Sequence, residues 1–497
     1  STGTLSSADK NTGVGAQVFA ALTSGDDNTA IGRASLNGNT TGSSNTAAGS
    51  SALNVNTTGI SNTAVGFSAL AANTTGGSNV AIGVCALCTN VSGGANIGIG
   101  VNALKLNTAS NNLAVGHCAM NDNSSGTENS AFGFLALNKN TTASQNTALG
   151  NQTLNANTTG ANNTAVGACS LYTNTTASSN TAVGFSSLVA NTTGANNVSV
   201  GTNALDSNTT GEGNVAVGVQ ALDANVSGYG NTAMGKQALC KNTANDNTAI
   251  GGAALCLNTS GANNTAVGKT ALVANTTASN NTAVGCGALL ANTTGVSNSA
   301  FGANALDANT TASNNTAIGM NSLSSTTTGC QNTALGGGAA DTNTTGDLNT
   351  AIGFGALSGN TTADNNTAVG ASALIANTTG ASNSAVGKGA LQDNTTGANN
   401  MAFGHLALEN NTTGLCNIAM GYYAMSANTT GRFNVGLGST ALSGNTSADS
   451  NVAIGDRALL GNSTGSNNVA AGRYALCSNT TGYCNVGIGL GALAGVT

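Results

Sequence analysis

The chain has 497 residues, of which only 6% are charged, with a formal net charge of -6, 70 glycines and no proline or tryptophan. An ordinary soluble domain has about 25% charged residues, so this composition argues against a conventional globular fold. The charge supplies no basic stripe for nucleic acid, and no apolar run approaches the roughly 18 residues of a membrane helix. The sequence therefore predicts neither a nucleic-acid partner nor a membrane span.

An irregular segment, 1–10, precedes a repeat of about 17 residues that recurs about 28 times over 11–497 and ends in an incomplete copy. One copy, 62–78, reads Asn-Thr-Ala-Val-Gly-Phe-Ser-Ala-Leu-Ala-Ala-Asn-Thr-Thr-Gly-Gly-Ser. A unit this short cannot bury an apolar face alone, so the copies must stack. We expect an all-β chain forming one continuous parallel β-solenoid of about 28 coils over 11–497. The copies before Asn112 and Asn247 each lack one residue.

Positions within the repeat are counted from its leading asparagine, which is Asn62 in the copy 62–78. The fifth position is glycine in every copy, the third is small, the fourth is apolar and the ninth is nearly always leucine. We expect a short strand over 63–66, a second one around 69–70 after a corner, and a turn at 73–76, where Asn and Gly tolerate positive φ. The fourth and ninth positions are expected to supply bulk to buried faces.

Asparagines at the first and twelfth positions are predicted to form ladders along the stack, in which each side-chain amide bonds to its equivalent in the next coil and satisfies polar groups of the wall. The predicted ladder residues are Asn62, Asn73, Asn163, Asn174, Asn366 and Asn377.

Charged residues of the repeats fall only at the sixth, seventh, tenth, eleventh, sixteenth and seventeenth positions, which indicates that these corners face water. The third and fourth positions point to opposite faces of the strand, yet neither is charged in any copy. We therefore expect one face inside the coil and the other against a second chain; a plain solvent-facing wall is the alternative.

The phrase Asn-Thr-Ala-Val-Gly-x-x-Ala-Leu, found at 264–272 and 366–374, resembles the head repeats of trimeric autotransporter adhesins. Over 11–497 the chain looks still closer to the Asn-Thr-Thr-Gly repeats of tail-fibre-like surface proteins that end in a self-cleaving chaperone domain. The resemblance implies a left-handed β-roll, three chains side by side, in an extended surface fibre. Neck, anchor, signal peptide and chaperone domain are lacking and the chain begins with Ser1, so we expect a processed product or a segment of a longer chain.

These patterns favour a non-enzymatic, extracellular structural fibre at a cell or virion surface, homotrimeric or filamentous, with adhesion as its use. A viral or phage tail-fibre shaft is the alternative of the same kind. A solenoid that binds ice or glycan is the alternative of another kind. Ice binding needs two outward threonine files separated by one residue, whereas Thr74 and Thr75 are adjacent.

No catalytic, cofactor or metal site is predicted. The two histidines, His117 and His405, lie far apart in the sequence, and no nucleophile and base fall in one coil. Cys85 and Cys88 form a CxxC across an expected corner and strand, without the further ligands of a zinc knuckle. The eleven cysteines occupy variable surface positions and are interpreted as scattered thiols, although Cys240 and Cys256 share a position on adjacent coils.

Two kinds of modification or ligand site remain as hypotheses. The Asn-Thr-Thr turns contain glycosylation sequons, although asparagine and threonine also suit turns and ladders; the candidate acceptors are Asn73, Asn157, Asn191, Asn377 and Asn428. The densest irregularity of the surface positions is a candidate contact patch for a glycan or a host-surface ligand, formed by Tyr422, Tyr423, Arg432 and Phe433.

Overall fold

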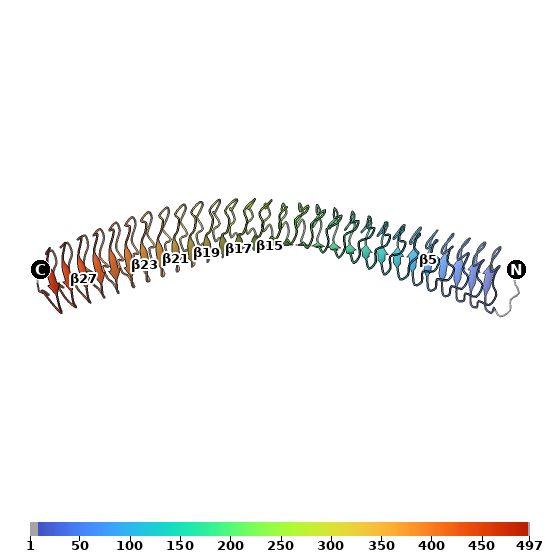
Figure 1. Ribbon diagram of the computed structural model, residues 1–497, viewed down its shortest axis with the longest axis horizontal. Coiled ribbons are helices and arrows are strands. Elements are labelled where there is room, and N and C mark those ends of the chain that lie inside the picture. Colours follow the sequence, from blue (N-terminus) through green and yellow to red (C-terminus); the bar gives the residue numbers. More distant parts are fainter. Residues whose placement is uncertain (1–7, 496–497) are drawn as a thin grey trace. The chain divides into compact units, whose positions relative to one another are not determined.

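The computed structural model describes residues 8–495 and has the predicted architecture of a parallel β-solenoid (Figure 1). Each coil contains one short strand, and these residues form no helix. The chain divides into two compact units, Ser1–Asp246 and Asn247–Thr497. Within each unit the coils follow one another without interruption. The boundary between the units falls at the second of the two shortened copies.

The strands of the first unit are β1 (Thr12–Val14), β2 (Thr29–Ile31), β3 (Thr46–Ala48), β4 (Thr63–Val65), β5 (Val80–Ile82), β6 (Ile97–Ile99), β7 (Leu113–Val115), β8 (Ser130–Phe132), β9 (Thr147–Leu149), β10 (Thr164–Val166), β11 (Thr181–Val183), β12 (Val198–Val200), β13 (Val215–Val217) and β14 (Thr232–Met234). Those of the second unit are β15 (Thr248–Ile250), β16 (Thr265–Val267), β17 (Thr282–Val284), β18 (Ser299–Phe301), β19 (Thr316–Ile318), β20 (Thr333–Leu335), β21 (Thr350–Ile352), β22 (Thr367–Val369), β23 (Ser384–Val386), β24 (Met401–Phe403), β25 (Ile418–Met420), β26 (Val435–Leu437), β27 (Val452–Ile454), β28 (Val469–Ala471) and β29 (Val486–Ile488).

Neighbouring strands within a unit pair in parallel, and each residue lies opposite its equivalent in the next copy. In β4 and β5, for example, Thr63 pairs with Val80 and Ala64 with Ala81. This register carries every position of the repeat along the unit as a straight file.

The predicted second strand around Ala69 and Leu70 is wrong, because this part of the coil is a run of turns. Ser68 and Leu70 both have φ 53°, in the left-handed region. As a result Ser68 N–H donates to Ser50 O of the preceding coil, at 3.0 Å, whereas Leu70 N–H donates to Ala86 O of the following coil, at 2.9 Å. These bonds between coils offset the cost of about 1–2 kcal/mol that a left-handed conformation carries for each non-glycine residue.

The core is narrow and is filled by small side chains together with one leucine in each coil. In the copy 62–78, Ala64, Ala69 and Leu70 are all 0% exposed. The ninth-position leucine is therefore buried as expected. The third-position alanine is the strand residue that points inward.

The shortened copy that begins at Asn96 shows where the repeat can lose a residue. The register β6 to β7 is intact, with Ile97 opposite Leu113. Asn96 Nδ2 donates to Ala109 O at 2.8 Å, as Asn79 Nδ2 donates to Gly93 O at 2.9 Å. The missing residue therefore belongs to the Thr-Thr turn, and the strand and the first-position ladder are unaffected.

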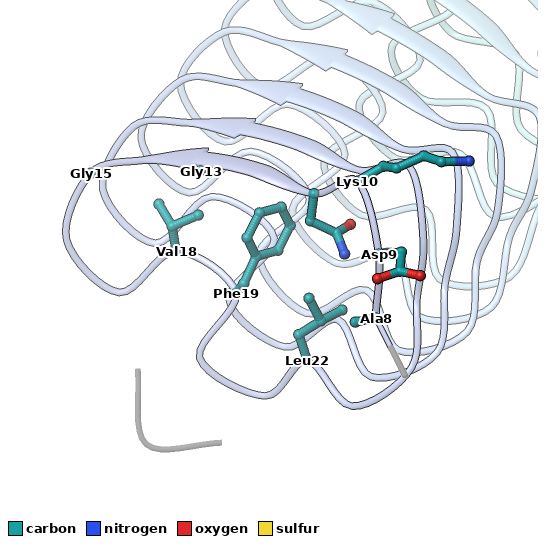
Figure 2. Close-up of a pocket in the computed structure, with 9 residues that line it drawn as sticks. Ala8, Asp9, Lys10, Gly13, Gly15, Val18, Phe19 and Leu22 are labelled. Carbon is teal, nitrogen blue, oxygen red and sulfur yellow. The ribbon is translucent and has the colours of Figure 1, made fainter. Parts of the chain in front are cut away.

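The first coil is packed differently from the others. Its eighth, ninth and twelfth positions hold Val18, Phe19 and Leu22 in place of the usual alanine, leucine and asparagine, and Figure 2 shows them around a hollow of this coil. The third position is Gly13, where a Cβ atom would lie 2.8 Å from Val18 Cγ1 and 3.1 Å from the Phe19 ring. Larger side chains from the turns thus take the space that alanine fills elsewhere.

Candidate interaction surface

The outward face of the strands exposes apolar side chains along each unit. Third-position residues are buried, so the second and fourth positions point away from the core. The fourth position is apolar in every copy, and its side chain is 39% exposed at Val65, 50% at Phe132 and 55% at Phe403. Neither outward position is charged in any copy. The single chain therefore presents a charge-free band of aliphatic, aromatic and threonine side chains.

This geometry corrects one expectation for the fourth position. In the single chain it supplies bulk to an outward face and not to the interior. Aromatic residues at the sixth position widen the band at the corner that follows the strand, and Phe67, Phe134 and Phe185 are 56%, 46% and 57% exposed. Ion pairs lie at the corners instead, and all three described pairs join adjacent coils: Lys139 with Asp122, Arg432 with Asp449, and Arg473 with Asp456.

The first-position asparagines form a continuous hydrogen-bonded file. Asn62 N–H and Nδ2 both donate to Asn45 Oδ1, at 3.0 and 3.1 Å, and Nδ2 also donates to Gly76 O at 2.9 Å. Asn163 N–H donates to Asn146 Oδ1 at 3.0 Å. Asn366 N–H donates to Asn349 Oδ1 at the same distance, although Asn366 Nδ2 has no partner.

The twelfth-position asparagines form a second file, this time through their side chains alone. Asn73 Nδ2 donates to Asn56 Oδ1 at 2.8 Å and to Gly76 O at 2.9 Å. Asn174 and Asn377 make the equivalent bonds to the asparagine of the preceding coil, at 2.9 and 3.0 Å. Both hydrogens of each amide are thereby used, one between coils and one within the turn.

The candidate glycosylation sites belong to this buried file. The side chains involved are Asn73, Asn157, Asn191, Asn377 and Asn428, and all five are 0% exposed. An oligosaccharide must be attached to the amide nitrogen, which here lies inside the wall and donates two hydrogen bonds. The folded coil therefore offers no accessible acceptor at these sequons.

The four residues of the candidate ligand patch stand on either side of the strands in the chain, two after β25 and two before β26 (Val435–Leu437). Tyr422 and Tyr423 follow β25, and their rings contact each other, with centroids 4.5 Å apart, and also contact His405 of the preceding coil. Arg432 and Phe433 precede β26 and so lie towards the opposite edge of the strands, where Arg432 pairs with Asp449. The predicted patch did not include His405, because His405 becomes a neighbour of Tyr422 only through the stacking of the sixth positions.

The threonines considered for ice binding lie in a turn and not on a strand. Thr74 Oγ1 donates to Val91 O of the next coil at 3.1 Å, and Thr75 is exposed beside it. The strand itself carries threonine at the second position and an aliphatic residue at the fourth in most copies. Two parallel outward threonine files, separated by one residue, are therefore not present on the described strands.

Cys85 and Cys88 lie in the turn region that follows β5 in one coil. Both are half-buried free thiols. Partial burial, followed by the charge and hydrogen bond of Cys85, raises the pKa of the Cys88 thiol to about 11, and the Lys105 ammonium opposes this increase. Cys240 and Cys256 are not among the free thiols of the described chain.

Asp206 and Asp223 occupy the tenth position on adjacent coils. Partial burial raises the pKa of both carboxyl groups, and the charge of Asp206 raises that of Asp223 further. The carboxyl group of an unfolded aspartate has a pKa of about 3.9, so the folded state binds these protons at higher pH than the unfolded state does. The carboxylates therefore destabilise the fold at neutral pH, and this cost is relieved as pH falls through their raised folded pKa values.

We expect the double variant Asp206→Asn/Asp223→Asn to be more stable than the wild type at neutral pH and to lose part of the gain in stability on mild acidification. Asparagine occupies the tenth position in other coils, for example Asn37 and Asn155, so the substitution suits the turn. Denaturant unfolding at a series of pH values measures the effect. Parallel pH dependences of the two proteins would contradict it.

No protein-family model matches the chain, and no curated protein matches it. No helix of the described residues is long and apolar enough to cross a membrane.

Proposed function

We propose that the chain is a non-enzymatic structural fibre whose copies associate through the outward face of their strands. The observation that carries this proposal is the charge-free band formed by the second and fourth positions, of which the fourth is apolar in every copy. Soluble monomers rarely expose contiguous apolar patches of more than a few hundred Å². With a strand spacing of about 4.8 Å and three residues of about 3.3 Å, each coil offers roughly 50 Å² of this face.

The size of the band is appropriate for a stable assembly. The fourteen strands of the first unit together present on the order of 700 Å². A standard protein interface buries about 800 Å² on each partner. The resemblance of the repeat to trimeric surface proteins supports three copies side by side, in a left-handed roll.

The same resemblance supports an extended fibre at the surface of a cell or a virion, as an adhesin or as a fibre shaft. The exposed corners vary in charge from coil to coil, whereas the strand face is uncharged in every copy. Recognition of a host-surface ligand or glycan is therefore assigned to corner residues. The strand face serves assembly.

The assembly is tested by placing three charges on the strand face, in the variant Val166→Lys/Val183→Lys/Val200→Lys. We expect the wild type to sediment at three times its chain mass of 47.5 kDa and the variant to sediment at the mass of one chain. The matched control places lysine at the eleventh position of the same coils, in Thr173→Lys/Ala190→Lys/Ser207→Lys, because that position lies outside the strand face and already carries lysine elsewhere.

Analytical ultracentrifugation measures the masses, and circular dichroism checks that the β-signal is retained. The control is expected to remain assembled. A wild type that is monomeric at micromolar concentration, or a strand-face variant that remains assembled, would refute association through this face.

A further inference from the structure

The corner that follows β24 to β28 brings aromatic and arginine side chains together in consecutive coils. It consists of the sixth and seventh positions, which backbone hydrogen bonds join from coil to coil. Tyr423 N–H donates to His405 O at 3.1 Å, and Arg457 N–H donates to Ser439 O at 3.0 Å. Because each coil is joined to the next in this way, the side chains stand in one row along the corner.

Two stacked rings occupy one end of this row. The rings of His405 and Tyr422 are nearly parallel, with 16° between their planes and 5.7 Å between their centroids. The ring of Tyr423 packs against both of them at a steep angle. The next sixth position is Ser439, which has no ring to continue the stack. Tyr422 is accordingly 56% exposed and can accept another flat, apolar surface.

Two of the four arginines of the chain meet at the other end of the row. The Cζ atoms of Arg457 and Arg473 lie 5.3 and 5.0 Å from the centroid of the Tyr474 ring, and Arg457 Nη1 also donates to the Tyr474 hydroxyl group. Asp456 pairs with Arg473 at 3.2 Å, whereas Arg457 makes no ion pair within the described residues. Tyr474 therefore holds a guanidinium group whose charge is not neutralised.

The exposed ring and this guanidinium group are close enough to contact one small ligand. Tyr422 and Arg457 are two coils apart, which is about 10 Å at a strand spacing of about 4.8 Å, and the short side chain of Ser439 lies between them. Binding sites combine aromatic surfaces with a few polar groups that orient the ligand. A guanidinium group binds a carboxylate through two parallel hydrogen bonds. A suitable ligand therefore has an apolar face and a carboxylate at its edge.

We propose that this corner binds a carboxylate-bearing sugar of an acidic oligosaccharide, with the C–H face of the sugar ring on Tyr422 and the carboxylate on Arg457. The inference rests on the proposed function, in which the corners recognise the ligand, and it names the class of that ligand. A neutral glycan lacks the charge, and an acidic peptide lacks the ring.

The corner stays open when the strand faces associate. Its sixth positions include Lys388, Asp456 and Arg473, so it does not continue the charge-free band. Charged side chains are depleted from the buried centre of protein interfaces. Assembly through the strand face and binding at this corner are therefore compatible.

The test is a calorimetric titration of the full-length chain with trigalacturonic acid, and with its methyl ester as the neutral counterpart. We expect one site per chain for the acid and binding of the ester that is weaker by about 10-fold or more, because hydrogen bonds to charged groups are the stronger ones. Added sodium chloride should weaken binding of the acid and leave that of the ester unchanged.

Two variants separate the roles of the charge and the ring. Arg457→Gln is expected to weaken binding of the acid by about 10-fold or more and to leave that of the ester unchanged. Tyr422→Ala is expected to weaken binding of both several-fold. Glutamine and alanine occur naturally at these positions, in Gln152 and Ala168, so both variants should fold.

A third variant is expected to bind more tightly. Asp456→Asn removes the carboxylate that competes for Arg473 and should strengthen binding of the acid several-fold, whereas a merely structural role of Asp456 predicts no gain. Asparagine occupies the same position in Asn151. The matched control is Phe134→Ala, because Phe134 stacks on His117 in the same way, with 18° between the planes, but no arginine follows in the next two coils. The control should bind as the wild type does.

Four outcomes would overturn the proposal: no heat of binding at millimolar acid, equal affinity for the acid and the ester, wild-type affinity in Arg457→Gln, or displacement of the acid by a triglutamate peptide at equal concentration. Sedimentation of the same samples keeps the two proposals apart. A chain that assembles without binding the acid refutes this inference alone, and a monomeric chain that binds it refutes the assembly alone.

Discussion

Replacing Gly184 by alanine is expected to lower the free energy of unfolding of the first unit by about 3–5 kcal/mol, at the upper end of single-residue effects. Gly184 holds the fifth position, with φ 135°, and a Cβ atom there would lie 2.6 Å from Gly201 O and 2.7 Å from its carbonyl carbon. A side chain would therefore be strained by the backbone conformation and would also collide with the backbone of the next coil. Denaturant unfolding followed by circular dichroism measures the loss.

Gly194→Ala is the matched control because the fifteenth position is also closely packed. A Cβ atom at Gly194 would approach Gly211 O of the next coil. Alanine nevertheless occupies this position in other coils, and Ala177 there accepts hydrogen bonds from Asn163 and Asn174 at 2.9 and 3.0 Å. We expect the control to cost less than about 1 kcal/mol. Equal losses in the two variants would show that the left-handed φ is not the decisive feature.

Removal of one twelfth-position amide, in Asn174→Ala, is expected to cost about 3 kcal/mol. Its Nδ2 donates to Asn157 Oδ1 and Ala177 O, and its Oδ1 accepts from Asn191 Nδ2 at 2.9 Å. The variant loses all three bonds and leaves buried polar atoms of two neighbouring coils without partners, which is the costly outcome. Chemical denaturation of the two proteins measures the difference.

The neighbouring Thr175→Val is the control for the ladder. Thr175 Oγ1 donates to Thr192 O at 3.2 Å, but valine occupies this position naturally in Val91 and Val226. A loss below about 1 kcal/mol is expected, as for one ordinary hydrogen bond. Equal losses in the free energy of unfolding for Thr175→Val and Asn174→Ala would contradict the larger contribution expected of the ladder.

The twelfth-position ladder is interrupted at Thr326, which allows the reverse experiment. Thr326 takes the twelfth position of its coil, where both its Oγ1 and Asn309 Oδ1 are buried without a partner. Thr326→Asn would supply the missing donor to Asn309 and an acceptor for Asn343. An increase in stability of about 1–3 kcal/mol is expected.

The stacked architecture could be predicted from the sequence because the repeat has a fixed period. Only a straight stack brings asparagine opposite asparagine at every coil, so the partners of Asn62 and Asn73 follow from the period alone. The charge-free positions correctly indicated the wall of the coil, and the charged positions correctly indicated its corners. These features depend on which position stacks on which, and not on the path of the chain within one coil.

The path within the coil was less predictable. Ser68 and Leu70 take left-handed conformations, which are uncommon for such residues, and a stretch ending in Ala-Leu therefore suggested a strand. The narrow interior that results has room for alanine at the third position. The bulkier fourth-position residue consequently faces outward, which composition alone does not reveal.

The aromatic cluster was missed for a related reason. His405 contacts Tyr422 because their coils are adjacent. Arg432, by contrast, pairs with Asp449, which holds the same position in the next coil. Proximity in this fold follows repeat position more than sequence distance.

The intact register at the shortened coil after Asn96 has a consequence for how such a gene can change. Each coil requires only the same small set of ladder and glycine residues in the coils next to it. Recombination between similar stretches of the gene can therefore add or remove whole coils, and the remaining coils still meet in the same way. A change of one residue is tolerated where it falls in the Thr-Thr turn. The number of coils is therefore the property that this kind of gene can change most freely. Related chains should differ in their number of coils before they differ in the structure of one coil.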